Sequence, residues 1–220
     1  MSGWIIDRID FIDNKTCEFC NRPLKTNIAY ILIRDGIEVP AGPHCSHKNA
    51  KNPGERIPDF TKASLDIPDD DENGPGSGGG SGGGKGKHPR PAGYYEIEYL
   101  RLRAEKLIDF RDAIFPKLSD VYAKYKATGL DDGDIGYLDG LIKKVSAEKP
   151  LLSPKNLQIC YAYSFWLQRY LDRKGKNDFI SSILSQLKAK MRLSEAQLAA
   201  ANKCFETIGR IPRLDTKAFL

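Results

Sequence analysis

The sequence lacks long apolar runs and any segment that resembles a secretory leader. None of its apolar stretches approaches the roughly 18 residues that a membrane-spanning helix needs. The first residues alternate apolar and acidic side chains, and no basic region followed by an apolar region marks a signal peptide. We therefore expect a cytoplasmic protein with no membrane partner, in which paired cysteines hold metal more often than they form disulfides.

Motifs that carry catalysis are missing as well. The chain has only three histidines and five cysteines. No nucleophile triad, phosphate-binding loop or pair of carboxylates stands at a recognisable spacing. We therefore expect a protein that is not an enzyme and has no small-molecule substrate.

Charge of one sign is not strongly concentrated in any part of the chain. The net charge is +5, from 34 basic and 29 acidic side chains. It divides into +1 for residues 1–63, −2 for residues 64–93 and +6 for residues 94–220. The modest positive charge of the last segment is compatible with a polyanionic partner, and equally with an ordinary solvated helical surface.

Glycine is unevenly distributed and divides the chain into three segments. Nine of the 20 glycines lie between Gly74 and Gly86, next to a run of acidic residues. Such a stretch has no apolar side chains to offset the cost of ordering its backbone. We predict an α+β protein with a zinc-finger domain at 1–63, a flexible acidic and Gly/Ser-rich linker at 64–93, and an all-α helical bundle at 94–220. The linker composition fits a natural tether and an engineered one equally well.

The first segment has the pattern of a small β-rich domain. Residues 4–12 form a strand-like apolar run, and residues 28–33 and 37–39 form two more, separated by Asp35-Gly36. An Asp-Gly pair between apolar runs is a strong signal for a hairpin. A segment of this size with so few apolar side chains usually needs a disulfide or a metal to be stable.

Cysteine and histidine spacing supplies a candidate metal site. Cys17 and Cys20 form a Cys-x-x-Cys pair, and Cys45 follows the predicted hairpin with a histidine on each side. A tight Cys-x-x-Cys turn presents two thiolates to one zinc ion, which takes four ligands in a tetrahedron. We predict zinc bound by Cys17, Cys20, Cys45 and His47, with His44 as the competing fourth ligand. A thioredoxin-like redox pair is the alternative, but it needs a βαβ context that is absent here.

This arrangement resembles a known class of zinc finger. Residues 14–52 are similar to the treble-clef-like fingers of small phage and bacterial proteins, in which Cys-x-x-Cys and Gly-Pro-x-Cys elements recur. The resemblance implies a structural zinc held by a turn, a hairpin and a helix start. Nucleases of the HNH type share this fold, but they need an Asp-His pair on the hairpin, and Arg34-Asp35-Gly36 offers no histidine.

The third segment has helical periodicity and a weak twofold repeat. Pro116 is expected either to kink the first helix or to begin a second one. Ser153 and Ser194 have the position of N-caps. Residues 137–157 match residues 179–198, which suggests two stacked helix–turn–helix units. The predicted helices are 94–127, 135–147, 154–172, 177–190 and 195–209.

Basic residues in both folded segments could contact phosphates. Tyr163, Trp166 and Tyr170 could stack on bases, although their helical spacing is more typical of a core. We expect a zinc-binding accessory protein that contacts nucleic acid, of phage or mobile-element origin. The alternative is a protein–protein adaptor or inhibitor that docks on a host or replication protein. The candidate nucleic-acid contacts are Arg22, Lys25, Lys48, Lys51, Lys143, Lys144, Arg173 and Lys174.

Overall fold

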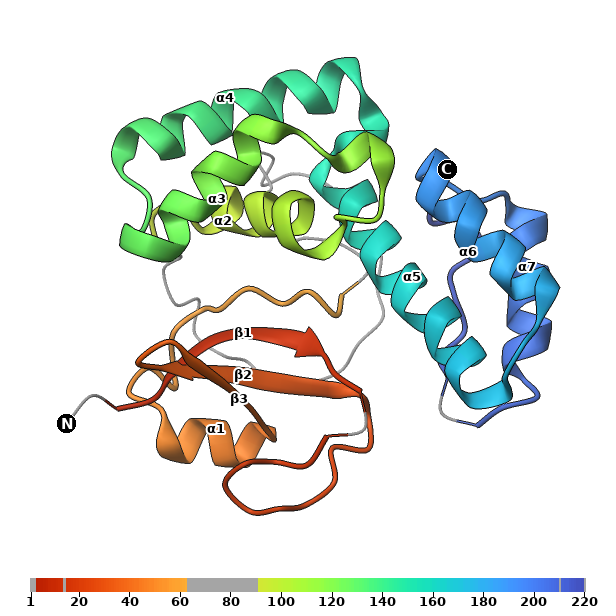
Figure 1. The fold of residues 1–220 in the computed structure, drawn as a ribbon, viewed down its shortest axis with the longest axis horizontal. Helices are drawn as coiled ribbons and strands as arrows, with labels where there is room; N and C mark the ends of the chain where they lie inside the picture. The colour runs from red at the N-terminus through yellow and green to blue at the C-terminus, as the bar shows by residue number, and fades with distance from the viewer. Residues whose placement is uncertain (1–2, 14, 63–90, 210, 220) are drawn as a thin grey trace, which may run out of the picture.

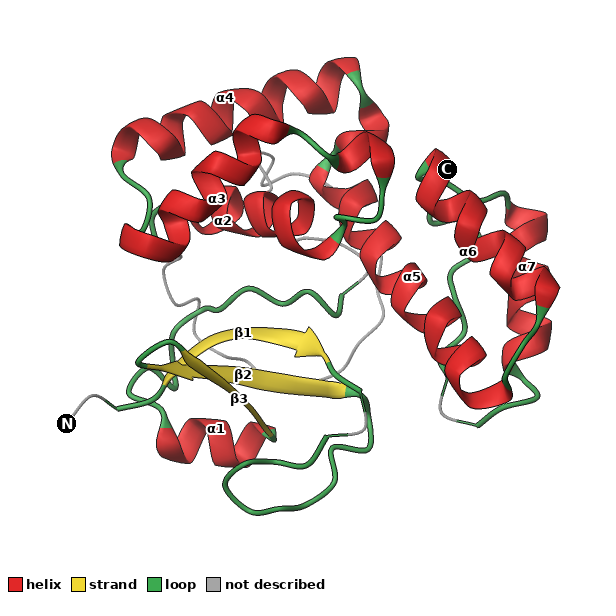
Figure 2. Ribbon diagram, in the orientation of Figure 1, coloured by secondary structure: helices red, strands yellow, loops and turns green. Residues whose placement is uncertain are grey.

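A computed structural model describes residues 3–13, 15–62, 91–209 and 211–219, and residues 64–90 of the linker predicted at 64–93 lie outside these ranges. The described part combines a three-stranded sheet with seven α-helices, so the α+β class is confirmed (Figures 1 and 2). The elements are β1 (Ile5–Phe11), β2 (Ile28–Arg34), β3 (Ile37–Ala41), α1 (Pro43–Asn49), α2 (Tyr94–Arg101), a π-helix (Leu102–Lys106), a 3-10 helix (Arg111–Ala113), α3 (Pro116–Thr128), α4 (Asp132–Glu148), a 3-10 helix (Pro150–Leu152), α5 (Pro154–Lys174), α6 (Asp178–Lys190) and α7 (Glu195–Phe205).

The sheet is antiparallel with the strand order β1-β2-β3. The predicted hairpin is confirmed: Asp35 and Gly36 connect β2 to β3 with φ values of 51° and 79°. Two consecutive positive φ values define a type I′ turn, whose twist matches that of the paired strands. A shift of register between Ile6 and Arg8 marks a bulge in β1.

The two faces of the sheet have different neighbours. Figure 1 shows α1 on one side of the sheet and α2, α3 and α4 on the other. On the α1 side, Leu32, Val39 and Ala41 are buried in a small apolar cluster together with Cys17. Arg8 and Asp10 are two residues apart on β1 and therefore share one face, where both are buried.

The helical segment follows most of the predicted boundaries. Pro116 occupies the first turn of α3, so this proline begins a second helix. Ser153 and Ser194 accept hydrogen bonds from the backbone amides of Asn156 and Gln197, as expected for N-caps. The prediction of one continuous helix from residue 94 to Pro116 was wrong. The chain there passes from α2 into a π-helix and then turns, with Phe110 in an extended conformation.

Glycine 93 belongs to the folded part although the sequence places it in the linker. It is buried, precedes α2 and has φ of 74°. A Cβ atom at this position would lie 3.0 Å from Cδ1 of Ile135 in α4. The close approach of α4 and the left-handed backbone together explain why glycine fits here.

The two copies of the weak repeat occupy equivalent positions in α4–α5 and α6–α7. Leu138 and its counterpart Ile180 are both fully buried. Leu157 and its counterpart Leu198 are likewise fully buried. The repeated pattern therefore marks positions that contribute to the same hydrophobic core.

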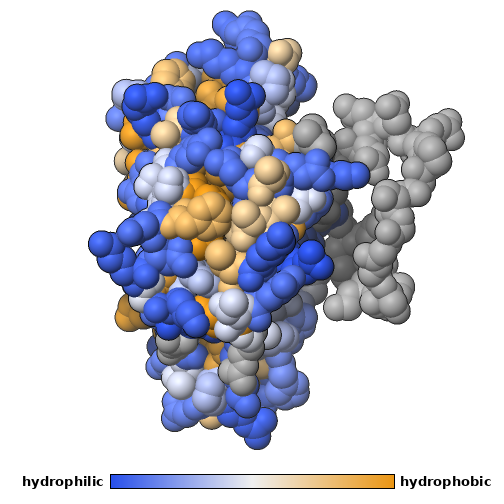
Figure 3. All heavy atoms as spheres, turned by 90° about the vertical axis from the view of Figure 1, so that its right-hand side faces the viewer, coloured by the Kyte–Doolittle hydropathy of each residue, from blue (hydrophilic) through white to orange (hydrophobic). Residues whose placement is uncertain are grey.

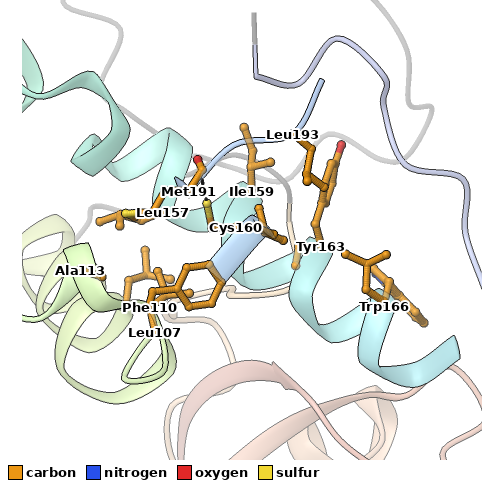
Figure 4. Close-up of a cluster of buried hydrophobic side chains, with 14 of the residues drawn as sticks. Leu107, Phe110, Ala113, Leu157, Ile159, Cys160, Tyr163, Trp166, Met191 and Leu193 are labelled. Carbon is orange, nitrogen blue, oxygen red and sulfur yellow. Dashed lines mark hydrogen bonds between the residues drawn. The ribbon is translucent and has the colours of Figure 1, made fainter. Parts of the chain in front are cut away.

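One hydrophobic cluster contains residues of both the N-terminal and the helical segment. Phe11 on β1 and Phe60 are buried in the cluster that is otherwise formed by α2 to α7, their connections and Leu214 in the segment after α7. The ring of Phe11 stacks on Phe165 with 4.2 Å between centroids and 11° between planes. Figure 4 shows the neighbouring part of this cluster, where Cys160 of α5 donates a hydrogen bond to the carbonyl of Met191 at 3.4 Å. The N-terminal sheet is thus packed against the helices.

Charged side chains also join the sheet to the helices. Asp10 accepts hydrogen bonds from Arg8 Nε (2.9 Å) and Tyr161 Oη (2.7 Å), and it forms an ion pair with Lys106. Next to it, Arg101 in α2 pairs with Asp7 at 2.8 Å. The contacts of Asp10 with Tyr161 and Lys106, and of Asp7 with Arg101, connect positions about 90 to 150 residues apart. Together the pairs satisfy charges that would otherwise be costly to bury.

Glu105 belongs to the same network, because it forms ion pairs with Arg101 and Lys106, and the ionisation of the network follows from its pairing. Burial by itself raises the pKa of Glu105, but Arg101 and Lys106 more than offset this effect and hold the pKa at about 2. Burial likewise disfavours the charged form of Arg8, yet its hydrogen bonds to acidic groups raise its pKa above the ordinary value. Glu105 and Arg8 are therefore both charged at neutral pH.

Candidate metal centre

The first two cysteines lie in a tight turn between β1 and β2. The amide of Cys17 donates to the carbonyl of Arg22 at 2.9 Å, and the amide of Asn21 donates to the carbonyl of Cys17 at 2.8 Å. Asn21 adopts φ of 54°, a left-handed conformation that asparagine tolerates better than most residues. The amide of Glu18 donates to the carbonyl of Pro40 at 3.0 Å, which fastens this turn to β3.

The third cysteine reaches the turn through the hairpin and α1. Strand β3 ends at Ala41, and α1 begins at Pro43, so Cys45 lies in the first turn of this helix. The sulfur atoms of Cys17, Cys20 and Cys45 all lie within 4.8 Å of one another. The structure therefore brings together three of the four predicted ligands, and these three thiols could hold a metal ion.

The three thiols differ in environment. Cys17 is buried, Cys45 is half-buried and Cys20 is exposed. Burial raises the pKa of Cys17, but backbone amides, that of Gly42 foremost, outweigh it and lower the pKa to about 7. Hydrogen bonds with Cys20 and Cys17 raise the pKa of Cys45 to about 11. Neighbouring thiols thus oppose the ionisation of Cys45. A cation that lies among the three sulfurs removes this opposition, because it stabilises all three thiolates.

The two candidate histidines lie on α1, and neither belongs to the group of three close sulfurs. The ring of His47 packs edge-on against Tyr30 of β2, with 5.6 Å between ring centroids. His44 instead lines a surface pocket of about 550 Å³ whose lining also includes all three cysteines.

Basic side chains surround this pocket. Arg22 and Lys48 line it, and of the described residues that form its wall none is acidic. Lys25 is exposed close by in the chain. Lys48 and Lys51 do not share a helical face, because α1 ends at Asn49 and the amide of Lys51 donates to the carbonyl of Trp4 at 2.9 Å.

The predicted contacts in the helical segment lie far along the chain, on α4 and at the end of α5. Lys143 and Lys144 are exposed on α4, and Lys143 pairs with Asp139 at 2.9 Å. At the end of α5, Lys174 is exposed, whereas Arg173 is half-buried and donates to the carbonyl of Gly209 and to Asn27 Oδ1.

The candidate stacking aromatics are part of the core. Tyr163, Trp166 and Tyr170 are all buried, at 3%, 8% and 3% exposure. Side chains at this burial cannot present a face to a nucleic-acid base, so the core interpretation of their helical spacing is confirmed.

Comparisons of the chain with protein-family models, curated proteins and solved structures gave no match. Within the described residues, no helix is both long and apolar enough to cross a membrane.

Sequence reasoning missed the charged network between sheet and helices. Asp7 and Asp10 stand out only as polar residues in a strand-like run, and nothing local pairs them with Arg101 or Lys106. The sequence signal that assigns Arg8 and Asp10 to a single face is their two-residue spacing in a strand-like run, and the structure shows both of them buried.

Proposed function

We propose that this chain is a zinc-binding, non-enzymatic accessory protein that contacts nucleic acid with the surface around its three cysteines. Thiolates are the ligands that zinc favours in structural sites. The apolar cluster beside the thiols is small, with five buried side chains including Cys17. A zinc ion would supply stability that such a cluster lacks, in a treble-clef-like arrangement of turn, hairpin and short helix.

Charge around the metal pocket carries the nucleic-acid part of the proposal. Arg22 and Lys48 line this pocket, and no acidic side chain is among the described residues that line it. Both side chains are exposed, so both can reach a phosphate group in solvent. Basic side chains grouped without compensating acids are typical of phosphate-contacting surfaces.

The metal is tested first, on the intact chain. Elemental analysis of the purified protein should find about one zinc ion per chain, the number that one tetrahedral site holds. Cys45→Ser should lose this zinc, whereas Cys160→Ser should retain it because Cys160 is buried in the helical core. A metal-free wild-type protein, or full retention of zinc in Cys45→Ser, would contradict the proposed centre.

Nucleic-acid contact is tested by fluorescence anisotropy with short labelled single-stranded DNA, duplex DNA and RNA. Affinity should fall steeply between about 50 and 200 mM salt, because phosphate contacts release counterions. The double variant Arg22→Ala/Lys48→Ala should bind more weakly and reduce the salt slope by about 2. Lys203→Ala, an exposed lysine on α7, is the matched control and should behave as wild type. Failure to bind all three probes at low salt would refute this function.

Exposed apolar surface favours the alternative, a protein–protein adaptor or inhibitor. Ile114 and Leu151 are 54% and 39% exposed, and they line one groove of about 540 Å³. Figure 3 shows hydrophobic atoms surrounded by hydrophilic ones on the side of the molecule where α6 and α7 lie. Apolar patches with polar rims are typical of protein contacts. Leu151→Asp should then abolish binding to a protein partner without changing nucleic-acid affinity.

A further inference from the structure

Three thiols leave one position of a tetrahedral zinc site to be filled. Among the described residues, the group of ligand atoms within 4.8 Å of one another contains Cys17, Cys20 and Cys45 and no histidine or carboxylate. The fourth ligand must therefore be a side chain that borders this group or a molecule from solvent. The pocket lined by the three cysteines has one further lining side chain able to bind zinc, His44.

Helix geometry separates the two histidines. Successive residues of an α-helix point about 100° apart. His47, two residues after Cys45, therefore points about 200° away from the direction of Cys45, while His44 points about 100° away. The ring of His47 is also engaged with Tyr30, at 5.6 Å between centroids.

The side of α1 that carries Cys45 offers no other ligand. Lys48 follows Cys45 by three residues, shares its face and lines the same pocket. An ammonium group does not bind zinc, so this position cannot complete the centre. His44 is exposed, and packing does not fix its side chain in place.

We infer that His44 supplies the fourth ligand and closes the centre as a Cys3His site. This inference rests on the proposed zinc centre, and it reverses the preference for His47 that the sequence suggests. A closed site has no open position for water, so a metal held in this way is structural and does not activate a nucleophile.

The experiment compares zinc affinity and the Co²⁺ absorption spectrum of His44→Ala, His44→Cys and His47→Ala with those of the wild-type chain. Zinc affinity is measured by competition with a chromophoric chelator. His44→Ala should bind zinc at least about 10-fold more weakly, since even the loss of a group that only orients a ligand costs about 10- to 100-fold. His44→Cys should keep tight binding and show stronger thiolate-to-Co²⁺ absorption, and His47→Ala should match wild type.

Each result decides the assignment. Weakened binding in His47→Ala with normal binding in His44→Ala would assign the ligand to His47 and overturn the inference. Normal binding in both variants would show that the fourth ligand comes from elsewhere, and it would also overturn the inference while leaving the zinc proposal intact. A wild-type chain that binds neither zinc nor Co²⁺ would refute the zinc proposal, and the assignment to His44 with it.

Discussion

Asp10→Asn tests how strongly the sheet and the helices depend on each other. Asp10 is 3% exposed. Its Oδ1 accepts from Tyr161 Oη at 2.7 Å and from the amide of Phe11 at 2.9 Å, while its Oδ2 accepts from Arg8 Nε at 2.9 Å and pairs with Lys106. Asparagine removes the charge and places an NH₂ group against one of these two pairs of donors. Loss of one partner from a buried ion pair costs about 3–5 kcal/mol, which we expect as the loss in free energy of unfolding.

Urea denaturation followed by far-UV circular dichroism measures this loss. The far-UV signal reports mainly on the helices, whereas the substitution lies in β1, so a lower midpoint shows that the charged network couples the two parts. Asp139→Asn is the control, because Asp139 forms an exposed pair with Lys143 that is worth about 0.3–0.5 kcal/mol. An Asp10→Asn variant whose free energy of unfolding stays within about 1 kcal/mol of the control would refute the reasoning.

Three further predictions use the same measurement or a simple variant of it. The pKa of Glu105 is depressed from 4.5 to about 2, so the stabilisation by its charged form is complete above pH 4.5 and is lost as the pH falls toward 2. In urea titrations, the free energy of unfolding of Glu105→Gln should therefore fall less than that of wild type over this pH range. Phe11→Ala should cost about 3–5 kcal/mol because it empties a buried aromatic stack, while Phe179→Ala, 46% exposed, should cost far less. Gly36→Ala should cost about 1 kcal/mol by thermal unfolding, from its φ of 79° alone, since no atom lies within 4 Å of the added Cβ.

Local features of the fold could be predicted because they depend on neighbouring residues. The type I′ turn at Asp35-Gly36 and the N-caps at Ser153 and Ser194 each arise from the chemistry of a few consecutive residues. The π-helix after α2 could not be predicted, since the periodic apolar pattern of residues 94–115 fits a continuous helix. That stretch packs against α5 and forms ion pairs with Asp7 and Asp10 of β1, and the local pattern contains neither interaction.

In the candidate metal centre, too, one part could be predicted from the local sequence and another part depends on tertiary contacts. The spacing of Cys17, Cys20 and Cys45 was sufficient to predict that their sulfurs meet, because a turn and a hairpin return the chain over a short distance. The direction of His47 was not predictable from its nearness to Cys45 in the sequence. It depends on where α1 begins and on the contact with Tyr30 across the sheet.

By itself the sequence determined the three converging thiols, the hairpin and most helix boundaries, since these rest on interactions between residues close in the chain. Only the tertiary structure decided that the N-terminal sheet and the helices share one hydrophobic cluster and one charged network. The reason is physical: the stack of Phe11 on Phe165 and the bond from Tyr161 to Asp10 join residues about 150 positions apart. Which of many buried side chains meet over such a distance is set by the packing of the whole chain.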